Sequence, residues 1–247
     1  MTALRWRREL LAFVFCAALL TDCARNPFSR KYEYEEDIYL RLDGSVTIYV
    51  NAAVPALVAL RGADLPIDPK ARLDRQKVRA FYDTSVSHVA SVTNSRRDNR
   101  RYVHLRVDVP DIRKLSDASP FAWSTYRFDR RDNDVEYRQL VGASASREVG
   151  SVGWDGRELA ALRLHLPSRV LFHNSPSKTI RRGNIIEWEQ PLSDRMKGVM
   201  VDIQVRMESE SILFRTLSLF GLMAIAVAIT FAVVIWAVRR RGSGEPR

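Results

Sequence analysis

Three hydrophobic patterns follow one another along the chain, and the last of them is the longest. Residues 216–238, TLSLFGLMAIAVAITFAVVIWAV, contain no charged side chain, and Arg239, Arg240 and Arg241 end the run. At about 1.5 Å of rise per residue, a helix of this length reaches roughly 34 Å, enough to cross a hydrocarbon core of about 30 Å. The pattern predicts a single transmembrane helix over residues 212–238.

The three arginines predict the orientation of this helix. Lys and Arg residues next to a span are retained on the cytoplasmic side of a membrane. Arg239, Arg240 and Arg241 are therefore the expected topology-determining residues, and residues 239–247 are expected to form a short basic cytoplasmic tail. The part of the chain before the helix is placed on the extracytoplasmic side.

The first hydrophobic pattern lies at the N-terminus and is short. Arg5, Arg7 and Arg8 precede the apolar run LLAFVFCAALL, residues 10–20. Such a run is too short to span a bilayer but has the length of a signal-peptide core. Residues 1–23 are predicted to be a signal peptide, which leaves residues 24–211 as one extracytoplasmic domain.

The cysteines add a lipidation site to this prediction. Cys16 and Cys23 are the two cysteines of the chain, so residues 24–211 contain no disulfide. The sequence Leu20-Thr21-Asp22-Cys23 resembles a bacterial lipobox, in which the cysteine is acylated, and Cys23 is the predicted lipidation site. Asp22 departs from the small residue of that pattern, and cleavage after Ala18 is the alternative.

The middle of the chain shows the third pattern, a period of two. Tyr34, Ile38 and Leu40 share one face of a strand, and Val46, Ile48 and Val50 continue the set after Asp43-Gly44-Ser45. This alternation predicts a β-hairpin. A loop of three residues keeps the apolar set on one side and pairs Leu40 with Ile48 and Ile38 with Val50, whereas a two-residue turn would place Leu40 opposite Thr47.

Two helical segments follow the hairpin. Pro55 begins one or two helical turns, and Asp68-Pro69 supplies a cap for the principal helix, which is expected to run to about Tyr82. The basic face of this helix is interpreted as solvated rather than as a surface that docks on lipid. Its members are Arg72, Arg75, Lys77 and Arg79.

Strands dominate the rest of the domain. The segment NSRRDNRR, residues 94–101, is interpreted as a polar connection that is too charged to bury, and residues 142–156 as a long loop. The remaining alternation predicts strands at 86–93, 103–109, 121–128, 135–141, 162–166 and 199–207, with a short helix at 111–117. The fold class is therefore α+β: a mainly antiparallel β-sheet of about seven to nine strands with one principal helix, plus the C-terminal transmembrane helix.

The net charge of the domain is smaller than that of the whole chain. The chain has 39 Lys and Arg residues against 29 Asp and Glu, a formal charge of +10. Eight of the basic and three of the acidic residues lie in the two ends, which leaves 31 against 26, or about +5, for the domain. We therefore expect no nucleic-acid partner, whereas a modestly basic surface near anionic headgroups is natural.

The sequence contains no recognisable catalytic motif. His88, His104, His165 and His173 lack the spacing of a metal site, and no nucleophile elbow or phosphate-binding glycine loop occurs. Glu187 and Glu189 flank Trp188 and are interpreted as a solvated strand face. The chain is expected not to be an enzyme and to use no metal or cofactor.

Several short motifs resemble the LppM-like family of bacterial envelope proteins. They are Leu42-Asp43-Gly44-Ser45-Val46, Leu166-Pro167-Ser168-Arg169-Val170, His173-Asn174, and Gly183-Asn184-Ile185-Ile186-Glu187-Trp188. The resemblance implies a lipobox signal peptide, a sheet-rich extracytoplasmic domain and a C-terminal membrane helix. For function it implies an envelope protein, with affinity for lipids or glycolipids as one role.

Taken with the residues themselves, these observations favour a single-pass protein of the bacterial cytoplasmic membrane with a non-catalytic binding or scaffold role. An envelope protein or a lipid is the expected partner besides the membrane. The alternative function is lipid or glycolipid binding in a groove between the sheet and the principal helix. A hydrolase of envelope material ranks third, because it would need a cluster of acidic or histidine side chains.

Overall fold

The computed structural model describes residues 30–97 and 99–242, and it confirms the α+β class. Within these residues ten strands form two sheets, where a single sheet was expected. The strands are β1 (Lys31–Leu40), β2 (Val46–Ala53), β3 (His88–Arg97), β4 (Arg100–Val109), β5 (Ser124–Arg130), β6 (Asp134–Val141), β7 (Glu158–His165), β8 (Val170–His173), β9 (Ile185–Pro191) and β10 (Val201–Glu208). The helical elements are α2 (Val54–Arg61), α3 (Arg75–Tyr82), the 3-10 helices η1 (Ile112–Asp117) and η2 (Ser119–Phe121), α4 (Leu192–Met196) and α5 (Ile212–Gly242).

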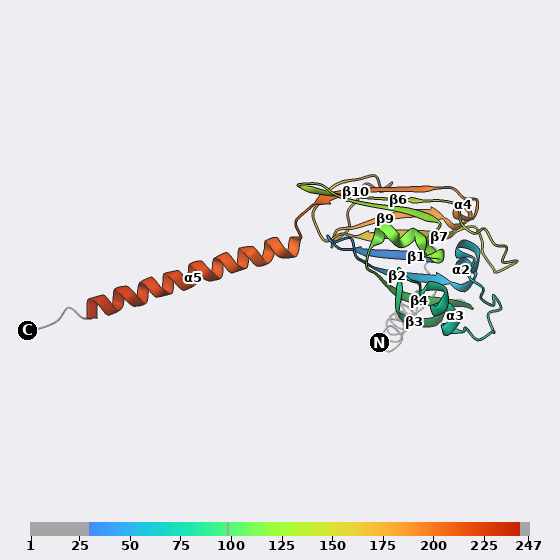
Figure 1. Cartoon of the computed structure of the whole chain (residues 1–247). Helices are drawn as coiled ribbons and strands as arrows, with labels where there is room; N and C mark the ends of the chain where they lie inside the picture. The colour runs from blue at the N-terminus through green and yellow to red at the C-terminus, as the bar shows by residue number, and fades with distance from the viewer. Residues whose placement is uncertain (1–29, 98, 243–247) are drawn as a thin grey trace, which may run out of the picture. The chain divides into compact units, whose positions relative to one another are not determined.

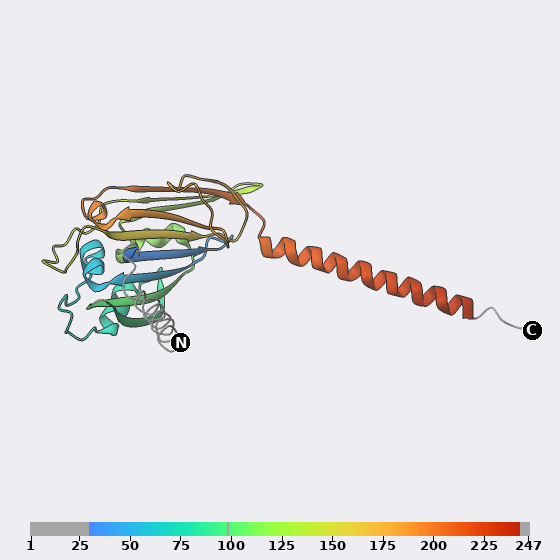
Figure 2. The ribbon, with the colours of Figure 1, turned by 180° about the vertical axis from the view of Figure 1, so that it is seen from behind.

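The two sheets lie one over the other, as Figures 1 and 2 show from opposite sides. One sheet has six strands in the order β3-β4-β2-β1-β7-β9, and the other has four in the order β5-β6-β10-β8. Alternate residues of both sheets belong to one hydrophobic core, among them Ile48, Val50, Leu105 and Val107 from the first sheet and Val135, Tyr137, Ile203 and Val205 from the second. The period of two in the sequence thus records one buried face for each sheet.

The first hairpin has the predicted parity but a different register. Ile38 pairs with Ile48, and Leu40 pairs with Val46. The predicted pairs of Ile38 with Val50 and of Leu40 with Ile48 are therefore wrong by two positions along β2. Apolar residues still face apolar residues, because even positions remain opposite even positions.

Gly44 explains the difference in register. The loop holds three residues, Leu42-Asp43-Gly44, one position earlier than predicted, and the Arg41 N–H closes it by donating to the Ser45 carbonyl at 3.0 Å. Gly44 has a φ of 86°, and the last residue of such a loop adopts this left-handed conformation. Glycine is favoured at the last position of such a loop, and the whole loop therefore lies one residue earlier than predicted.

Helix α2 begins at the predicted place and is entirely buried. Pro55 lies in its first turn, and Gly62, at a φ of 70°, ends it by donating its N–H to the Val58 carbonyl. All eight residues of α2 are buried. Two carbonyls near its end, those of Ala59 and Leu60, accept hydrogen bonds from the long loop that follows β6.

The start predicted for the principal helix is wrong. Helix α3 begins at Arg75, and Asp74 caps it by accepting from the N–H groups of Gln76 and Lys77. Asp68 instead accepts from the Lys70 N–H at 2.8 Å and forms a local turn. Both aspartates offer a helix cap, and the sequence alone does not show that the first one is used in a turn. The helix has eight residues, the same length as α2.

The segment predicted as a polar connection at 94–101 is mostly strand. Strand β3 runs to Arg97 and β4 starts at Arg100, with these two residues paired. The prediction that the segment is too charged to bury is wrong for Arg101, which is 5% exposed. Arg101 continues the inward-facing set of β4, so its position in the alternation overrides its charge.

The remaining predicted elements are found close to their expected positions. The hairpin of β5 and β6, the last strand β10 and a single-turn helix after Asp111 are all present. Residues 142–157 contain no regular element, as expected of a long loop.

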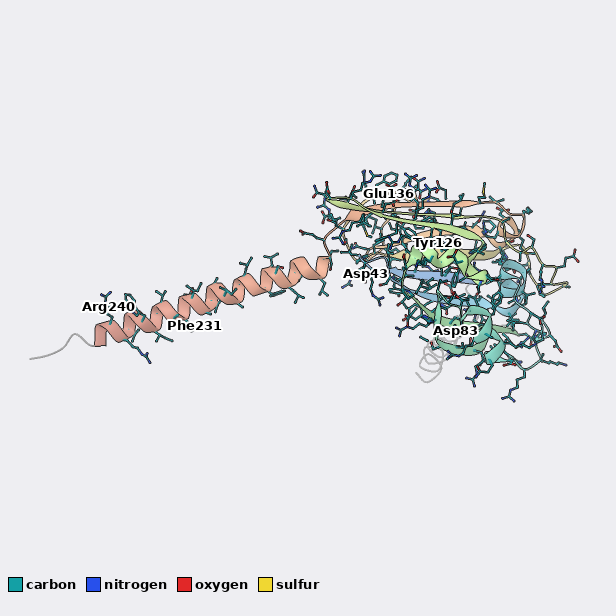
Figure 3. All side chains as sticks on the ribbon, viewed as in Figure 1. Asp43, Asp83, Tyr126, Glu136, Phe231 and Arg240 are labelled. Atoms are coloured by element: carbon teal, nitrogen blue, oxygen red, sulfur yellow. The ribbon has the colours of Figure 1, made fainter. Side chains whose placement is uncertain are left out.

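Helix α5 contains a segment that is long and apolar enough to cross a membrane, residues 216–240. Figure 3 shows its side chains, Phe231 and Arg240 among them, projecting from the helix, and none of the segment is buried against the rest of the chain. The helix continues to Gly242, so Arg239, Arg240 and Arg241 lie in its last turn rather than in a separate tail. Cys23 and the predicted signal peptide lie outside the described residues.

Candidate functional site

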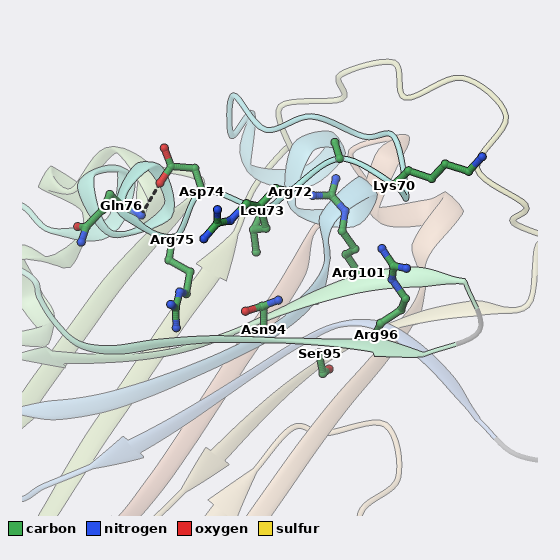
Figure 4. A pocket seen from close by; sticks show the side chains of 11 residues that line it. Lys70, Arg72, Leu73, Asp74, Arg75, Gln76, Asn94, Ser95, Arg96 and Arg101 are labelled. Carbon is green, nitrogen blue, oxygen red and sulfur yellow. Dashed lines mark hydrogen bonds between the residues drawn. The ribbon is translucent and has the colours of Figure 1, made fainter.

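A cleft of about 910 Å³ opens between the start of α3, the segment before it and the paired ends of β3 and β4 (Figure 4). Residues 70–76 form one wall, and Asn94, Ser95, Arg96 and Arg101 form the other. The antiparallel pairing of β3 with β4 places residues 94–96 opposite 101–103 and so forms the second wall, and the packing of α3 on β3 brings the first wall to it. Segments that are distant in the sequence thus line one cavity.

The lining of this cleft is strongly basic. Its charged members are Lys70, Arg72, Arg75, Arg96 and Arg101 against a single acid, Asp74, among the described residues that line it. The carboxylate of Asp74 already accepts the N–H groups of Gln76 and Lys77 as the cap of α3. Five positive side chains around one engaged carboxylate make the cleft a region of positive potential. We call it the basic cleft.

Arg101 is the buried member of the set. Its Nη2 donates to the Pro66 carbonyl, while Nε and Nη1 are buried without a hydrogen-bond partner among the described residues. Burial away from water lowers the pKa of the Arg101 guanidinium, which Asp68 opposes and Arg96 reinforces. A buried cation whose donors are unused is costly in the empty protein, and an anion at the cleft would supply its acceptors.

Arg96 lies in the same wall of the cleft as Arg101. Its Nη2 donates to the Pro69 carbonyl at 2.6 Å, so both arginines of this pair contact backbone carbonyls of the segment that covers them. Figure 4 shows Arg96 and Arg101 side by side beneath that segment, with Lys70 extending outward. Both of these contacts are to neutral backbone carbonyls, and Asp68 partly offsets the charge of Arg101.

Arg101 also borders a second cleft, of about 490 Å³. Its lining is less charged and includes Val54, Pro55, Ile67, Val149 and Val152. The long loop after β6 supplies Val149 and Val152, and α2 supplies Val54 and Pro55. Arg101 therefore lines both the basic cleft and a second cavity that is less charged.

The predicted groove between sheet and helix corresponds to a smaller cavity. A space of about 340 Å³ lies between α2, α3 and the segment joining them, and Leu57, Leu65, Val78 and Phe81 are among its lining. It is formed by two helices rather than by a sheet and a helix, because the buried helix α2 packs on β2 and β4 of the sheet.

The interpretation of Glu187 as part of a solvated face is wrong. Glu187 is 8% exposed, accepts from Arg163 Nε at 2.6 Å and forms an ion pair with Arg181. Arg163 also contacts Glu35 at 2.8 Å, so three strands of the six-stranded sheet share one charge network. None of these residues lines the basic cleft.

The four histidines are spread over the domain. His104 contacts Asn51 and Ser95, His165 contacts Asp37 at 2.9 Å, and His173 contacts Ser175. His88 lies 3.7 Å from Asp83. In residues 30–97 and 99–242 no group of three or more His, Cys, Asp or Glu side chains is arranged to hold a metal ion.

The site residues predicted from the sequence do not belong to this cleft. Arg239 and Arg240 lie at the end of α5, where the guanidinium of Arg240 lies over the ring of Trp236. Sequence reasoning missed the basic cleft because its cations come from separate segments. A signal was present, since Arg101 lies two positions before Val103, the first residue of the clear apolar alternation.

Comparison with known proteins yields a distant structural likeness. The folded domain of LppM from Mycobacterium tuberculosis, solved by NMR, is similar with a TM-score of 0.39 and 16% sequence identity, over 74% of this chain and 94% of that domain. No family model and no curated protein matches the chain. The likeness is one of fold at a distance and carries no information about the basic cleft.

Proposed function

We propose that this chain is a single-pass membrane protein of the bacterial cell envelope whose domain binds an anionic ligand, without catalysis, in the basic cleft. The observation that carries the proposal is the buried guanidinium of Arg101, whose Nε and Nη1 have no acceptor among the described residues. Helix α5 is the proposed anchor, with Arg239 to Arg241 on the cytoplasmic side.

The chemistry of the cleft favours phosphate or carboxylate groups. Guanidinium groups bind these oxyanions through several N–H donors in a fixed plane, and charge-assisted hydrogen bonds are the stronger ones. Arg72 and Arg75 are exposed around Arg101, so an anion with more than one charge could contact several cations. A multiply charged phosphate compound is therefore the ligand class that fits best.

A lipid or glycolipid is the second candidate ligand. The observation in its favour is the neighbouring cleft of about 490 Å³, which shares Arg101 and presents Val54, Ile67 and Val149. A ligand with an anionic group and an apolar body could occupy both cavities. This candidate predicts that a soluble phosphate compound binds much more weakly than its acylated counterpart.

The direct test is titration of the full chain in detergent micelles with tripolyphosphate. Arg101→Met should weaken binding by about tenfold or more, because it removes the buried cation that an anion would neutralise. Arg127→Met is the matched control, since it removes an exposed arginine from β5, outside the cleft. Equal affinity in the wild type and Arg101→Met would exclude the cleft as the binding site.

A further inference from the structure

We infer that the basic cleft takes its anion from the side of the domain that faces away from the membrane entered by α5, and not from lipid headgroups of that membrane. This inference rests on the proposed function and adds the source of the ligand. The ligand class it assigns is a phosphate-bearing polyanion in the surrounding medium. The membrane helix and the basic cleft lie at opposite ends of the strands.

The chain leaves the domain at an end that backbone hydrogen bonds define. The Glu208 N–H donates to the Arg169 carbonyl at 3.0 Å and the Ser209 N–H to the Asn133 carbonyl at 3.2 Å. The Ile212 N–H donates to the Pro167 carbonyl at 3.2 Å, where α5 begins. The segment between β10 and α5 is thus attached to the turns after β5 and β7 rather than being a free spacer.

The first hairpin loop lies at this same end. The Cβ position of Gly44 would lie 3.3 Å from the ring of Phe128, close to the turn that contains Asn133. The Ile112 N–H donates to the Gly44 carbonyl at 2.9 Å, so the end of β4 is here as well. We call this the linker end of the domain.

The basic cleft lies at the opposite end of the same strands. Strand β2 pairs with β4 from Val46 with Val109, at the linker end, to Ala53 with Tyr102, next to Arg101. Eight residues separate Arg101 from Val109, and at about 3.3 Å per residue this places the cleft roughly 26 Å from the linker end.

This attachment leaves the domain little freedom to tilt the basic cleft toward the anchoring membrane. Ile212 is already bonded to the domain, and the apolar segment that could cross a membrane starts at Thr216. Four helical residues span only about 6 Å. Headgroups of the anchoring membrane therefore meet the linker end, where Arg131 and Arg169 are exposed, while the cleft opens about three Debye lengths away at physiological salt.

The experiment reconstitutes the full chain in phosphatidylcholine vesicles and measures tripolyphosphate binding at about 150 mM salt. In one arm phosphatidylglycerol is included in the same vesicles, and in the other it is added as separate vesicles without protein. We expect phosphatidylglycerol in the same vesicles to change the tripolyphosphate affinity by less than about twofold. Arg101→Met vesicles give the background that is not due to the cleft.

The outcomes separate the inference from the proposed function. If phosphatidylglycerol in the same membrane weakens tripolyphosphate binding by about tenfold, the inference fails and the proposed function remains. If tripolyphosphate does not bind even in phosphatidylcholine vesicles, the proposed function fails together with the inference. Competition by the separate vesicles would identify a facing membrane surface as the source of the anion and would overturn the assignment to a polyanion in the medium. Absence of competition supports that assignment.

Discussion

Two buried guanidinium groups of this domain, those of Arg61 and Arg101, have opposite surroundings. Arg61 donates to the Tyr34 hydroxyl and the Glu36 carboxylate, and its guanidinium lies 3.5 Å from the centre of the Trp123 ring. Arg101 donates only to the Pro66 carbonyl among the described residues and borders two clefts. Both side chains are less than a tenth exposed.

The difference shows that burial of a charge does not by itself identify a site. Arg61 is matched by a carboxylate and by aromatic faces, so its charge is neutralised inside the protein. The positive charge of Arg101 is not paired with a carboxylate in this way and can interact with a ligand in the cleft. The contrast makes separate predictions for stability and for binding, because removing Arg61 breaks a pair and removing Arg101 does not.

The largest expected effect is on stability, from breaking the Arg61 pair. Arg61→Met leaves Glu36 as a buried carboxylate without its partner and should lower the free energy of unfolding by about 3–5 kcal/mol. Tryptophan fluorescence during urea unfolding of the full chain in detergent measures this loss. The double variant Arg61→Met with Glu36→Leu should recover a large part of it, and a double variant as unstable as the single one would show that the pair is not the cause.

Arg101→Met should change stability in the opposite direction. It removes an unpaired buried charge and leaves the carbonyl of Pro66, an exposed residue, to water, so the free energy of unfolding should rise by about 1 kcal/mol while tripolyphosphate binding weakens by about tenfold or more. The same urea experiment gives the sign. A loss of stability comparable to that of Arg61→Met would mean that Arg101 is a structural residue and would remove the contrast.

Tyr82 tests whether every unpaired polar atom in the interior marks a site. Its hydroxyl is buried without a hydrogen-bond partner among the described residues, yet it lies in the core near Arg61 and not in the cleft. Tyr82→Phe should stabilise the domain by about 1 kcal/mol and leave tripolyphosphate affinity unchanged. Weaker binding by this variant would show that the cleft extends into the core.

Alkaline pH tests the buried phenols of the core as a group. Burial raises the pKa values of Tyr34, Tyr82, Tyr126 and Tyr137 above 10, so near and above pH 10 the unfolded chain loses protons that the folded chain keeps. The stability that these groups contribute is complete below pH 10 and is lost as the pH rises further. Stability measured against pH should fall above 10, less steeply in Tyr82→Phe, and a curve that is flat to pH 12 would contradict the burial of these phenols.

The sequence predicts the parts of this fold that depend on local alternation. The even positions of β1 and β2, Pro55 in the first turn of α2, and the long apolar segment of α5 all identify their elements correctly. What it does not decide is which of two equal local signals is used. Asp68 and Asp74 both offer a helix cap, and the choice between them depends on the packing of α3 on β3.

The candidate site is harder to predict for a physical reason. Arg72 and Arg101 come together only through the pairing of β3 with β4 and the segment that covers them. Glu36 carried a clearer signal, since it occupies an even position in β1 between the buried Tyr34 and Ile38, and a carboxylate on an apolar face requires a buried partner. No pattern near residue 36 identifies that partner as Arg61.

Because of the strand order in the larger sheet, the domain can complete its folding only late in synthesis. Strand β1 lies between β2 and β7, and β7 is followed in the sheet by β9, so the N-terminal hairpin has an unfilled edge until about 120 further residues have been made. The carbonyl groups at the end of α2 likewise receive their hydrogen bonds only after residues 145 and 147 have been made. A chain exported from its N-terminus would therefore complete its folding only when α5 is already entering the membrane, and its edge strands would need protection from aggregation until then.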